Sequence, residues 1–515
     1  MNYLKRLAAA CGFLLVSAGL YFVYWSYNFH PVTFVFTSDG HGHILPERSW
    51  DEKDTPPLGG LGALSTFLTG LKEDYILTDS GDIFQGTPEG MLTEGRVVVE
   101  LMNELGYRAA ALGNHEFDYG QETLKNLEAL ASFPFLGSNI RLLDSEEQPD
   151  WVSPPFIIEE GDLSIGLIGA ITQDMPKLTG RDNIEGLEFT DIISEVRTAA
   201  ADLRKQGADI ILLLSHAGYE DDLHIAEELS QELDIILGGH THLVLDKPKI
   251  KKGVILGHPG CNFQYAGRLR AYYSHKRNRI NAYKYRLYPL RTDLYPPDEE
   301  IEALINSSMG EAAEMLNEEI GQVTVDLPSS LYGNGRGHRE LALGNWQTDI
   351  MRESLGVDFA FQNTGGIRTP LLKGPLKVRD IWKLSPFGNH LVEMTLTGQQ
   401  VRRLLEESVS GGYSYLQVSG LNFVFNTALP EGMRVLNVIV VDDDGGKTEI
   451  DDEEEYRLVT NSFLAGGGDG YTVFTEGKDV VETEIIMRDL QISYIRENPE
   501  VYASVEGRKL NVNAH

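Results

Sequence analysis

The chain has 515 residues, of which 42% are hydrophobic and 23% are charged, the composition of an ordinary globular protein. At about 150 residues per domain, this length predicts two or three domains. The formal net charge of −33 would repel nucleic-acid polymers over most of the surface, so we expect no DNA or RNA partner.

The first 30 residues are predicted to be a signal anchor. Lys5 and Arg6 precede about twenty uncharged, mostly apolar residues (7–27), which is enough to span a bilayer. Positive charge at this end keeps it in the cytoplasm and places the remainder outside, at the cell surface or in the periplasm. Small residues at 16–18 permit the alternative, a cleaved signal peptide and a secreted protein. We favour the anchor, because residues 19–27 stay strongly apolar beyond that site.

Residues 31–295 are predicted to form one domain in which short apolar runs alternate with helical segments at 58–71, 123–132 and 192–206. Apolar runs at 32–36, 75–78, 210–214 and 234–237 have the character of buried strands. In open α/β sheets, ligands bind beyond the carboxyl ends of the strands. The residues that follow these runs, together with the segment 111–120, are Asp39, His41, Asp82, Asn114, His216, His240 and His242.

These seven side chains are candidate metal ligands. Asp, His and Asn without cysteine suit manganese, zinc, cobalt or iron better than a thiolate-bound structural zinc. Seven ligands are too many for one tetrahedral ion, whereas two divalent ions that share Asp82 account for all of them. Such a pair, roughly 3.5–4 Å apart, clamps a phosphoryl group in two-metal hydrolases. An isolated histidine would more simply be a buried structural residue, but five segments share this pattern.

A connector and a second domain are expected to follow. Pro296 and Pro297 open a predicted amphipathic helix within a connector at 296–322, although this helix could instead belong to one domain. The second domain, at 323–515, is expected to hold the substrate away from the metals. Its distinctive segments are 339–345, 361–368, 413–420 and 461–471.

The metal-ligand motifs resemble the five-block pattern of calcineurin-like metallophosphoesterases, and the segment Gly113-Asn-His-Glu-Phe-Asp118 is similar to the 5′-nucleotidase branch. The resemblance implies that His115 and Asp118 form a catalytic dyad. The ligands it implies for one ion are Asp39, His41, Asp82 and His242. The ligands it implies for the other are Asp82, Asn114, His216 and His240.

The four segments of the second domain resemble the nucleotide-binding blocks of the same family. By this match Tyr415 and Tyr471 would sandwich a base, and stacking of this kind tolerates different bases. Arg339, Asn363 and Arg368 would contact phosphate, base or sugar groups, which suits the forked donors of arginine.

The fold implied is α/β, with an N-terminal metallophosphoesterase sandwich of two β-sheets flanked by helices and a C-terminal α/β nucleotide-binding domain. The function implied is hydrolysis of nucleoside 5′-monophosphates, with a small-molecule nucleotide as the partner. The alternatives are a 2′,3′-cyclic-nucleotide phosphodiesterase with 3′-nucleotidase activity and a UDP-sugar hydrolase. An inactive binding scaffold is a remote alternative, because the ligand set and the dyad are complete.

Overall fold

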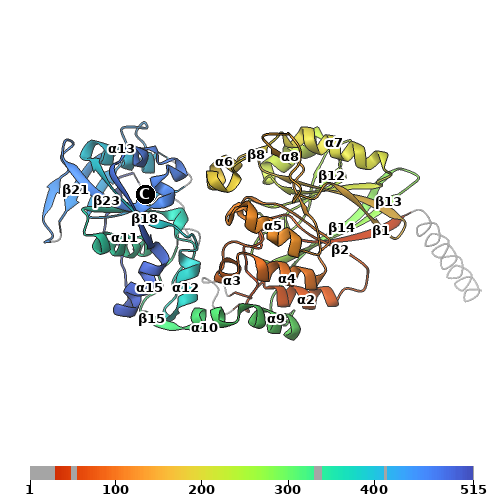
Figure 1. Cartoon of the computed structure of the whole chain (residues 1–515), viewed down its shortest axis with the longest axis horizontal. Helices are drawn as coiled ribbons and strands as arrows, with labels where there is room; N and C mark the ends of the chain where they lie inside the picture. The colour runs from red at the N-terminus through yellow and green to blue at the C-terminus, as the bar shows by residue number, and fades with distance from the viewer. Residues whose placement is uncertain (1–28, 48–54, 330–338, 411–413, 443, 514–515) are drawn as a thin grey trace, which may run out of the picture. The chain divides into compact units, whose positions relative to one another are not determined.

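The computed structural model describes residues 29–47, 55–329, 339–410, 414–442 and 444–513. The chain forms two compact units, and the division falls between Met309 and Gly310 (Figure 1). It lies inside the predicted connector, where the structure has two helices, α9 (Glu299–Met309) and α10 (Glu311–Asn317), rather than one. The helix breaks because Gly310 adopts a left-handed φ of 50°. The domain boundaries at 295 and 323 stay predictions.

The first unit contains two six-stranded sheets. The first sheet has the order β14-β13-β1-β2-β3-β4, and the second has the order β11-β12-β10-β9-β7-β6. The strands of the first are β1 His30–Thr37, β2 Ile76–Asp79, β3 Ala109–Ala111, β4 Phe135–Leu136, β13 Tyr265–Ser274 and β14 Arg279–Pro289. Those of the second are β6 Phe156–Glu160, β7 Leu163–Ile171, β9 Ile210–His216, β10 Ile235–Gly238, β11 Lys249–Lys251 and β12 Val254–Gly257.

The two sheets pack face to face around one apolar core. Side chains such as Phe34 and Ile76 of the first sheet join Leu167, Leu212 and Leu237 of the second in a single buried cluster. Helices cover the outer faces (Figure 1), so central strands are buried on both sides and are apolar throughout. These helices are α2 Leu61–Thr69, α4 Arg96–Leu105 and α5 Gly120–Leu130 on the first sheet, and α7 Ile192–Lys205 and α8 Tyr219–Glu228 on the second. The predicted sandwich is confirmed.

The second unit is also α/β, as predicted. A five-stranded sheet has the order β19-β16-β23-β18-β24, and a four-stranded sheet has the order β22-β21-β20-β26. The strands are β16 Phe359–Asn363, β18 His390–Thr397, β19 Leu416–Ser419, β20 Leu421–Phe425, β21 Val435–Val441, β22 Lys447–Glu449, β23 Glu455–Asn461, β24 Lys478–Ile486 and β26 Lys509–Asn511. The main helices are α11 Ala342–Leu355, α13 Gly398–Val409 and α15 Met487–Glu497. Both sheets and α13 contribute to one buried core.

The predicted anchor at residues 1–30 lies outside the described residues except for Phe29 and His30. Within the described ranges, the structure contains no helix of the length and apolarity needed to cross a bilayer.

Candidate metal centre

All seven predicted ligands lie at one edge of the sandwich, just beyond the carboxyl ends of parallel strands. β1, β2 and β3 are parallel neighbours in the first sheet, and β9 and β10 are parallel neighbours in the second. Parallel strands end at the same edge, so loops far apart in sequence converge there. Asp39 and His41 follow β1, Asp82 follows β2, Asn114 follows β3, His216 ends β9, and His240 and His242 follow β10.

Five of the seven residues have left-handed backbones. The φ angles are 51° at Asp39, 47° at His41, 57° at Asp82, 72° at His240 and 54° at His242. Non-glycine residues rarely adopt this conformation, which crowds Cβ against the backbone. Strained backbone persists only where the surrounding structure holds it, and it concentrates at functional sites. The loops are therefore shaped to aim these side chains inward.

A first group of side chains consists of Asp39, His41 and His242, whose ligating atoms all lie within 4.8 Å of one another. His41 Nε2 lies 3.0 Å from His242 Nε2, and His242 Nε2 lies 3.6 Å from Asp39 Oδ1. His41 Nδ1 donates a hydrogen bond to the Gln85 carbonyl at 2.9 Å, which leaves Nε2 as the ligating atom. Facing imidazole nitrogens next to a carboxylate suit a divalent cation between them.

A second group consists of Asp82, His216 and His240. His216 Nε2 lies 3.0 Å from Asp82 Oδ2, and the Ser80 carbonyl lies 2.7 Å from His216 Nδ1. The buried Oδ1 of Asn114 has no hydrogen-bond partner among the described residues, as expected of an amide oxygen that accepts a cation instead. Asp82 Oδ2 also lies 4.0 Å from His41 Nε2, so Asp82 adjoins both groups. The residues fit a two-ion site.

The electrostatics of these buried side chains also favour added positive charge. Burial raises the pKa of Asp39 to about 7. Burial alone would also raise the pKa of Asp82, but the neighbouring histidines, chiefly His216, hold it well below its usual value. Burial would lower the pKa of His216, but Asp82 raises it to about 10. Burial and His216 lower the pKa of His240 to about 4. Buried acids and histidines thus compete for protons that metal cations would replace.

The two residues of the predicted dyad, His115 and Asp118, are in contact. His115 Nδ1 lies 2.7 Å from Asp118 Oδ2, and the backbone N–H of His115 donates to Asp82 Oδ1 at 2.8 Å. The Asp118 carboxylate fixes the ring orientation of His115 beside Asp82. The His115 ring also lies within ligating distance of His41 and Asp82, so a ligand role is the competing assignment.

Glu116 is a further residue of this centre that sequence reasoning did not single out. It is 1% exposed, and its carboxylate accepts the backbone N–H groups of Asp82 at 2.8 Å, Ile83 at 2.7 Å and Gly113 at 2.6 Å. Burial, with Asp82 adding to it, raises the pKa of Glu116 to about 7. The sequence contains a partial signal for this role, since Glu116 stands three residues after Gly113, where the glutamate of a capping box accepts the N–H of the residue before the helix, although glycine has no side chain for the reciprocal bond.

In the second unit, three predicted substrate residues lie where β16 ends and β19 begins. Asn363 ends β16, and its Nδ2 donates to Asp469 Oδ2 at 2.8 Å. Tyr415 precedes β19, which pairs antiparallel with β16. The carbonyl of Arg339 accepts a hydrogen bond from Gln417 of β19 at 3.1 Å. Sequence reasoning gave no role to Asp469, whose pKa burial raises.

The side chains of the other two substrate candidates, Arg368 and Tyr471, pack against other residues of the second unit. The Arg368 guanidinium lies 5.6 Å from the centre of the Phe387 ring. Tyr471 is 1% exposed, belongs to the apolar core, and donates its hydroxyl to the Ser414 carbonyl at 2.7 Å. Tyr415 is only half-buried. Stacking of a base on Tyr471 therefore requires its covering residues to move, and the two-ring sandwich stays a prediction.

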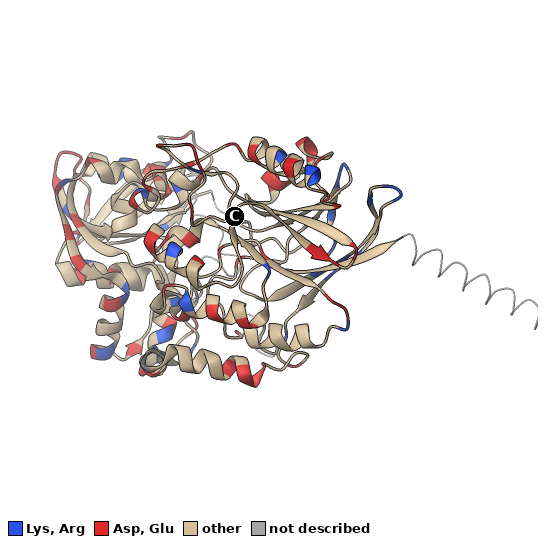
Figure 2. Cartoon of the chain, turned by 45° about the vertical axis from the view of Figure 1, so that its right-hand side comes forward, with Lys and Arg blue, Asp and Glu red and all other residues tan. Residues whose placement is uncertain are grey.

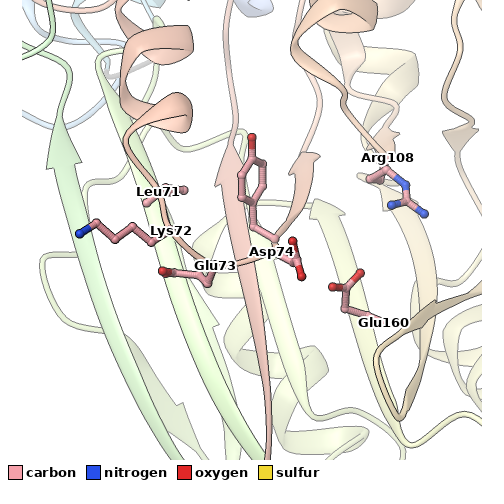
Figure 3. Close-up of a pocket in the computed structure, with 7 residues that line it drawn as sticks. Leu71, Lys72, Glu73, Asp74, Arg108 and Glu160 are labelled. Carbon is pink, nitrogen blue, oxygen red and sulfur yellow. The ribbon is translucent and has the colours of Figure 1, made fainter.

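A polar hollow of about 470 Å³ lies at the other end of the strands, where residues 71–75 lead into β2 and Arg108 leads into β3. Lys72, Asp74, Arg108 and Glu160 line it (Figure 3). The metal-ligand candidates follow the carboxyl ends of the strands, so this hollow is separate from the metal centre.

Comparison with known proteins agrees with this geometry. Residues 32–244 match the calcineurin-like phosphoesterase family, and residues 319–476 match the 5′-nucleotidase C-terminal domain. The chain is 28% identical to a snake venom 5′-nucleotidase of Gloydius brevicauda, over 97% of this chain and 90% of that protein. It is also 28% identical to a trifunctional nucleotide phosphoesterase of Bacillus subtilis, over 84% of this chain but only 32% of that longer protein.

The fold is likewise similar to a solved structure. A 5′-nucleotidase precursor from Thermus thermophilus is 29% identical and superposes with a TM-score of 0.82, covering 94% of this chain and 100% of that chain.

Proposed function

The chain belongs to the calcineurin-like phosphoesterases that carry a 5′-nucleotidase C-terminal domain, and we propose that it hydrolyses nucleoside 5′-monophosphates to nucleoside and phosphate. The observation that carries this proposal is the meeting of two groups of ligating side chains at Asp82. In two-metal hydrolases the ions lie roughly 3.5–4 Å apart, and a carboxylate shared between them can hold them at that distance.

We assign the ligands of the two ions from these groups. One ion would be held by Asp39, His41, Asp82 and His242, and the other by Asp82, Asn114, His216 and His240. When bound, two divalent ions clamp a phosphoryl group and make water a nucleophile at neutral pH. The nitrogen and oxygen donor set suits manganese, zinc, cobalt or iron.

His115 acts on the phosphate in this proposal. Asp118 holds its ring, and the backbone N–H bond to Asp82 fixes its position beside the centre. From there His115 stabilises charge on a phosphate oxygen or on the leaving oxygen. A positioned acid–base group contributes roughly 10²–10⁴-fold to turnover.

The nucleoside part of the substrate is proposed to bind the second unit. Arg339 and Arg368 supply cationic donors for an anionic or polar ligand. Asn363 supplies an amide at the end of β16, and Tyr415 supplies a half-buried ring. Tyr471 would act with Tyr415 once its covering residues move.

We also propose that the protein works outside the cytoplasm, tethered by an uncleaved anchor in residues 1–30. The apolar run and its preceding positive charges support this proposal. N-terminal sequencing of the protein recovered from membranes tests it, and a mature chain that begins after residue 18 would replace the anchor with a cleaved signal.

The hydrolysis is tested with His115→Ala. Turnover of AMP should fall roughly 10²–10⁴-fold while both ions stay bound. Loss of metal in this variant would make His115 a ligand and remove the dyad. The same assay on UDP-glucose, 2′,3′-cyclic AMP and 3′-AMP ranks the alternative esters, and an absence of turnover on all four would leave only a binding scaffold.

A further inference from the structure

The hairpin formed by β13 and β14 carries an unusual concentration of positive charge. Residues 265–289 contain seven lysines and arginines and no aspartate or glutamate, in a chain whose net charge is −33. The seven are Arg268, Arg270, Lys276, Arg277, Arg279, Lys284 and Arg286. We call this hairpin the basic ribbon; Figure 2 shows lysines and arginines gathered on strands and loops of this side of the first unit.

Cations face one another across the two strands of the basic ribbon. In the antiparallel register, Arg268 lies opposite Arg286 and Arg270 lies opposite Lys284. Like charges directly opposite one another destabilise a strand pair. An edge strand such as β14 is commonly protected from aggregation by lysine, but that purpose needs no cations on β13, an interior strand. Edge protection alone therefore does not account for the pattern.

Most of this charge is exposed and lacks an acidic partner. Lys276, Arg277, Arg279, Lys284 and Arg286 are exposed. Arg277 donates to Asn281, and the Arg286 guanidinium lies over the ring of Tyr288, but in the described part of the chain none of the five forms an ion pair.

Three acidic residues close to the basic ribbon form ion pairs with side chains other than these five cations. Glu73 pairs with Arg268, Asp209 with His275 at 3.3 Å, and Asp162 with His30 at 3.4 Å. The positive charge of the five exposed cations is therefore left for an external anion.

The tip of the basic ribbon lies where the chain enters the first unit. His30 begins β1 and pairs with Tyr273, and the rings of His30 and His275 lie 4.6 Å apart. Two residues, Asn28 and Phe29, separate Tyr27, the end of the apolar run, from His30, and the three steps from Tyr27 to His30 span at most about 10 Å. If residues 7–27 cross a bilayer, His30 must lie within about 10 Å of the membrane surface, a reach comparable to the Debye length of about 8 Å, and the tip of the ribbon lies beside His30.

We propose that the basic ribbon binds the surface of an anionic phospholipid bilayer and so holds the first unit against the membrane. Lysine and arginine near an anionic leaflet are attracted to its phosphate groups, and tyrosine favours the membrane–water interface. Tyr283 is a 40% exposed ring on β14, on the opposite face of the strand from Lys284. The placement of the tip rests on the proposed anchor, while the binding surface itself does not depend on the proposed hydrolysis.

The test uses the full chain mixed with liposomes of phosphatidylcholine alone or with about 30% phosphatidylglycerol. An inserted anchor would bring the protein to both kinds of liposome, so the measurement is hydrogen–deuterium exchange of residues 274–286. We expect protection of this segment on the anionic liposomes only, and its loss in roughly 0.5 M salt, because salt screens the attraction. Equal exchange on both kinds of liposome would overturn the proposal.

Two charge-matched variants complete the test. The ribbon variant combines Lys276→Gln, Arg277→Gln, Arg279→Gln and Lys284→Gln. The control variant combines Lys125→Gln, Lys205→Gln, Lys251→Gln and Lys252→Gln, which removes the same charge elsewhere in the first unit. We expect the ribbon variant to need at least tenfold more anionic lipid for the same protection and the control to match the native chain.

An equal loss of protection in both variants would mean that only net charge matters, which would also overturn the proposal. Hydrolysis of p-nitrophenyl phosphate should be unchanged in both variants. A chain that does not hydrolyse p-nitrophenyl phosphate, but whose ribbon is protected from exchange on anionic liposomes, would contradict the proposed function. The proposal that the ribbon binds the membrane would still stand.

Discussion

The carboxylate of Glu116 accepts a hydrogen bond from the backbone N–H of Asp82 at 2.8 Å. It thereby holds the loop that carries Asp82, whose side chain adjoins both groups of candidate ligands. The same carboxylate accepts the N–H of Ile83 on that loop and of Gly113 on the loop after β3. A single buried side chain thus couples two loops of the metal centre.

Glu116→Gln should weaken metal binding by roughly 10- to 100-fold, the usual effect of losing a group that orients a ligand. Glutamine has one acceptor oxygen in place of two, and its NH₂ group would face backbone N–H donors. Metal titration with turnover as a second readout measures the effect. Glu122→Gln, an exposed change on α5, is the control. Unchanged metal affinity in Glu116→Gln would show that the backbone holds the loop without it.

Asp82→Asn should lower metal content and activity more than any change of a ligand to one ion, such as His242→Asn. One substitution at Asp82 removes a charged donor next to both groups, whereas His242 belongs to one. Metal analysis and phosphate release from AMP compare the two variants, and chelation followed by added manganese, zinc or cobalt calibrates the assay. An Asp82→Asn protein with two bound ions and full activity would contradict the two-ion assignment.

Tyr415→Ala should raise the KM for AMP roughly five- to 150-fold and leave p-nitrophenyl phosphate nearly unaffected. A stacked base is worth about 1–3 kcal/mol, and the second ester has no base. An equal effect on both esters would show that Tyr415 supports the fold or the reaction and does not stack on a base.

Tyr471 needs a milder change, because its ring is part of the core and its removal would leave a cavity. Tyr471→Phe keeps the ring but breaks the hydrogen bond to Ser414. If Tyr471 positions the segment that carries Tyr415, this variant should raise the KM for AMP and leave p-nitrophenyl phosphate unchanged. An unchanged KM for AMP would show that the Tyr471 hydroxyl has no role in nucleotide binding.

Lys509 should make the free energy of unfolding depend on pH above neutrality. Burial lowers the pKa of Lys509 from 10.5 to about 7, although Glu340 opposes the shift. Between these values the unfolded chain binds a proton that the folded chain does not, so stability rises with pH by roughly 1 kcal/mol per pH unit from pH 7 to 10.5 and is constant below. Urea unfolding of Lys509→Met at pH 7, 8 and 9 should lack this slope, while the exposed control Lys373→Met should keep it.

The buried strands and the convergence of their carboxyl ends were predictable from sequence, because apolar runs end at polar residues, whereas the two-sheet sandwich was expected only from the family resemblance. The predicted helix at 192–206 is α7, which ends at Lys205, and the predicted strand at 32–36 is the core of β1. The role of Glu116 was not predictable from periodicity, because it depends on contacts with a loop 33 residues earlier.

Two other features could be recognised only from the three-dimensional structure. The break at Gly310 depends on a backbone conformation that glycine permits but does not require. The burial of Tyr471 depends on which segments cover it, and an aromatic residue after glycine is equally compatible with an exposed turn. Sequence patterns locate residues on elements, whereas the packing between elements determines how accessible each side chain is.

The left-handed backbone at Asp39, His41, Asp82, His240 and His242 affects how an alanine scan of the centre must be interpreted. Alanine removes the ligand but keeps a Cβ in an unfavourable conformation, whereas asparagine tolerates it and glycine relieves it. The native residue carries the same backbone cost, so an alanine variant reports the loss of the ligand and hides that cost. Comparing His240→Ala with His240→Gly separates them, since both lack the imidazole and differ by about 1–2 kcal/mol of backbone preference. A glycine variant more stable than its alanine counterpart would measure how much conformational energy the loops store around the ions.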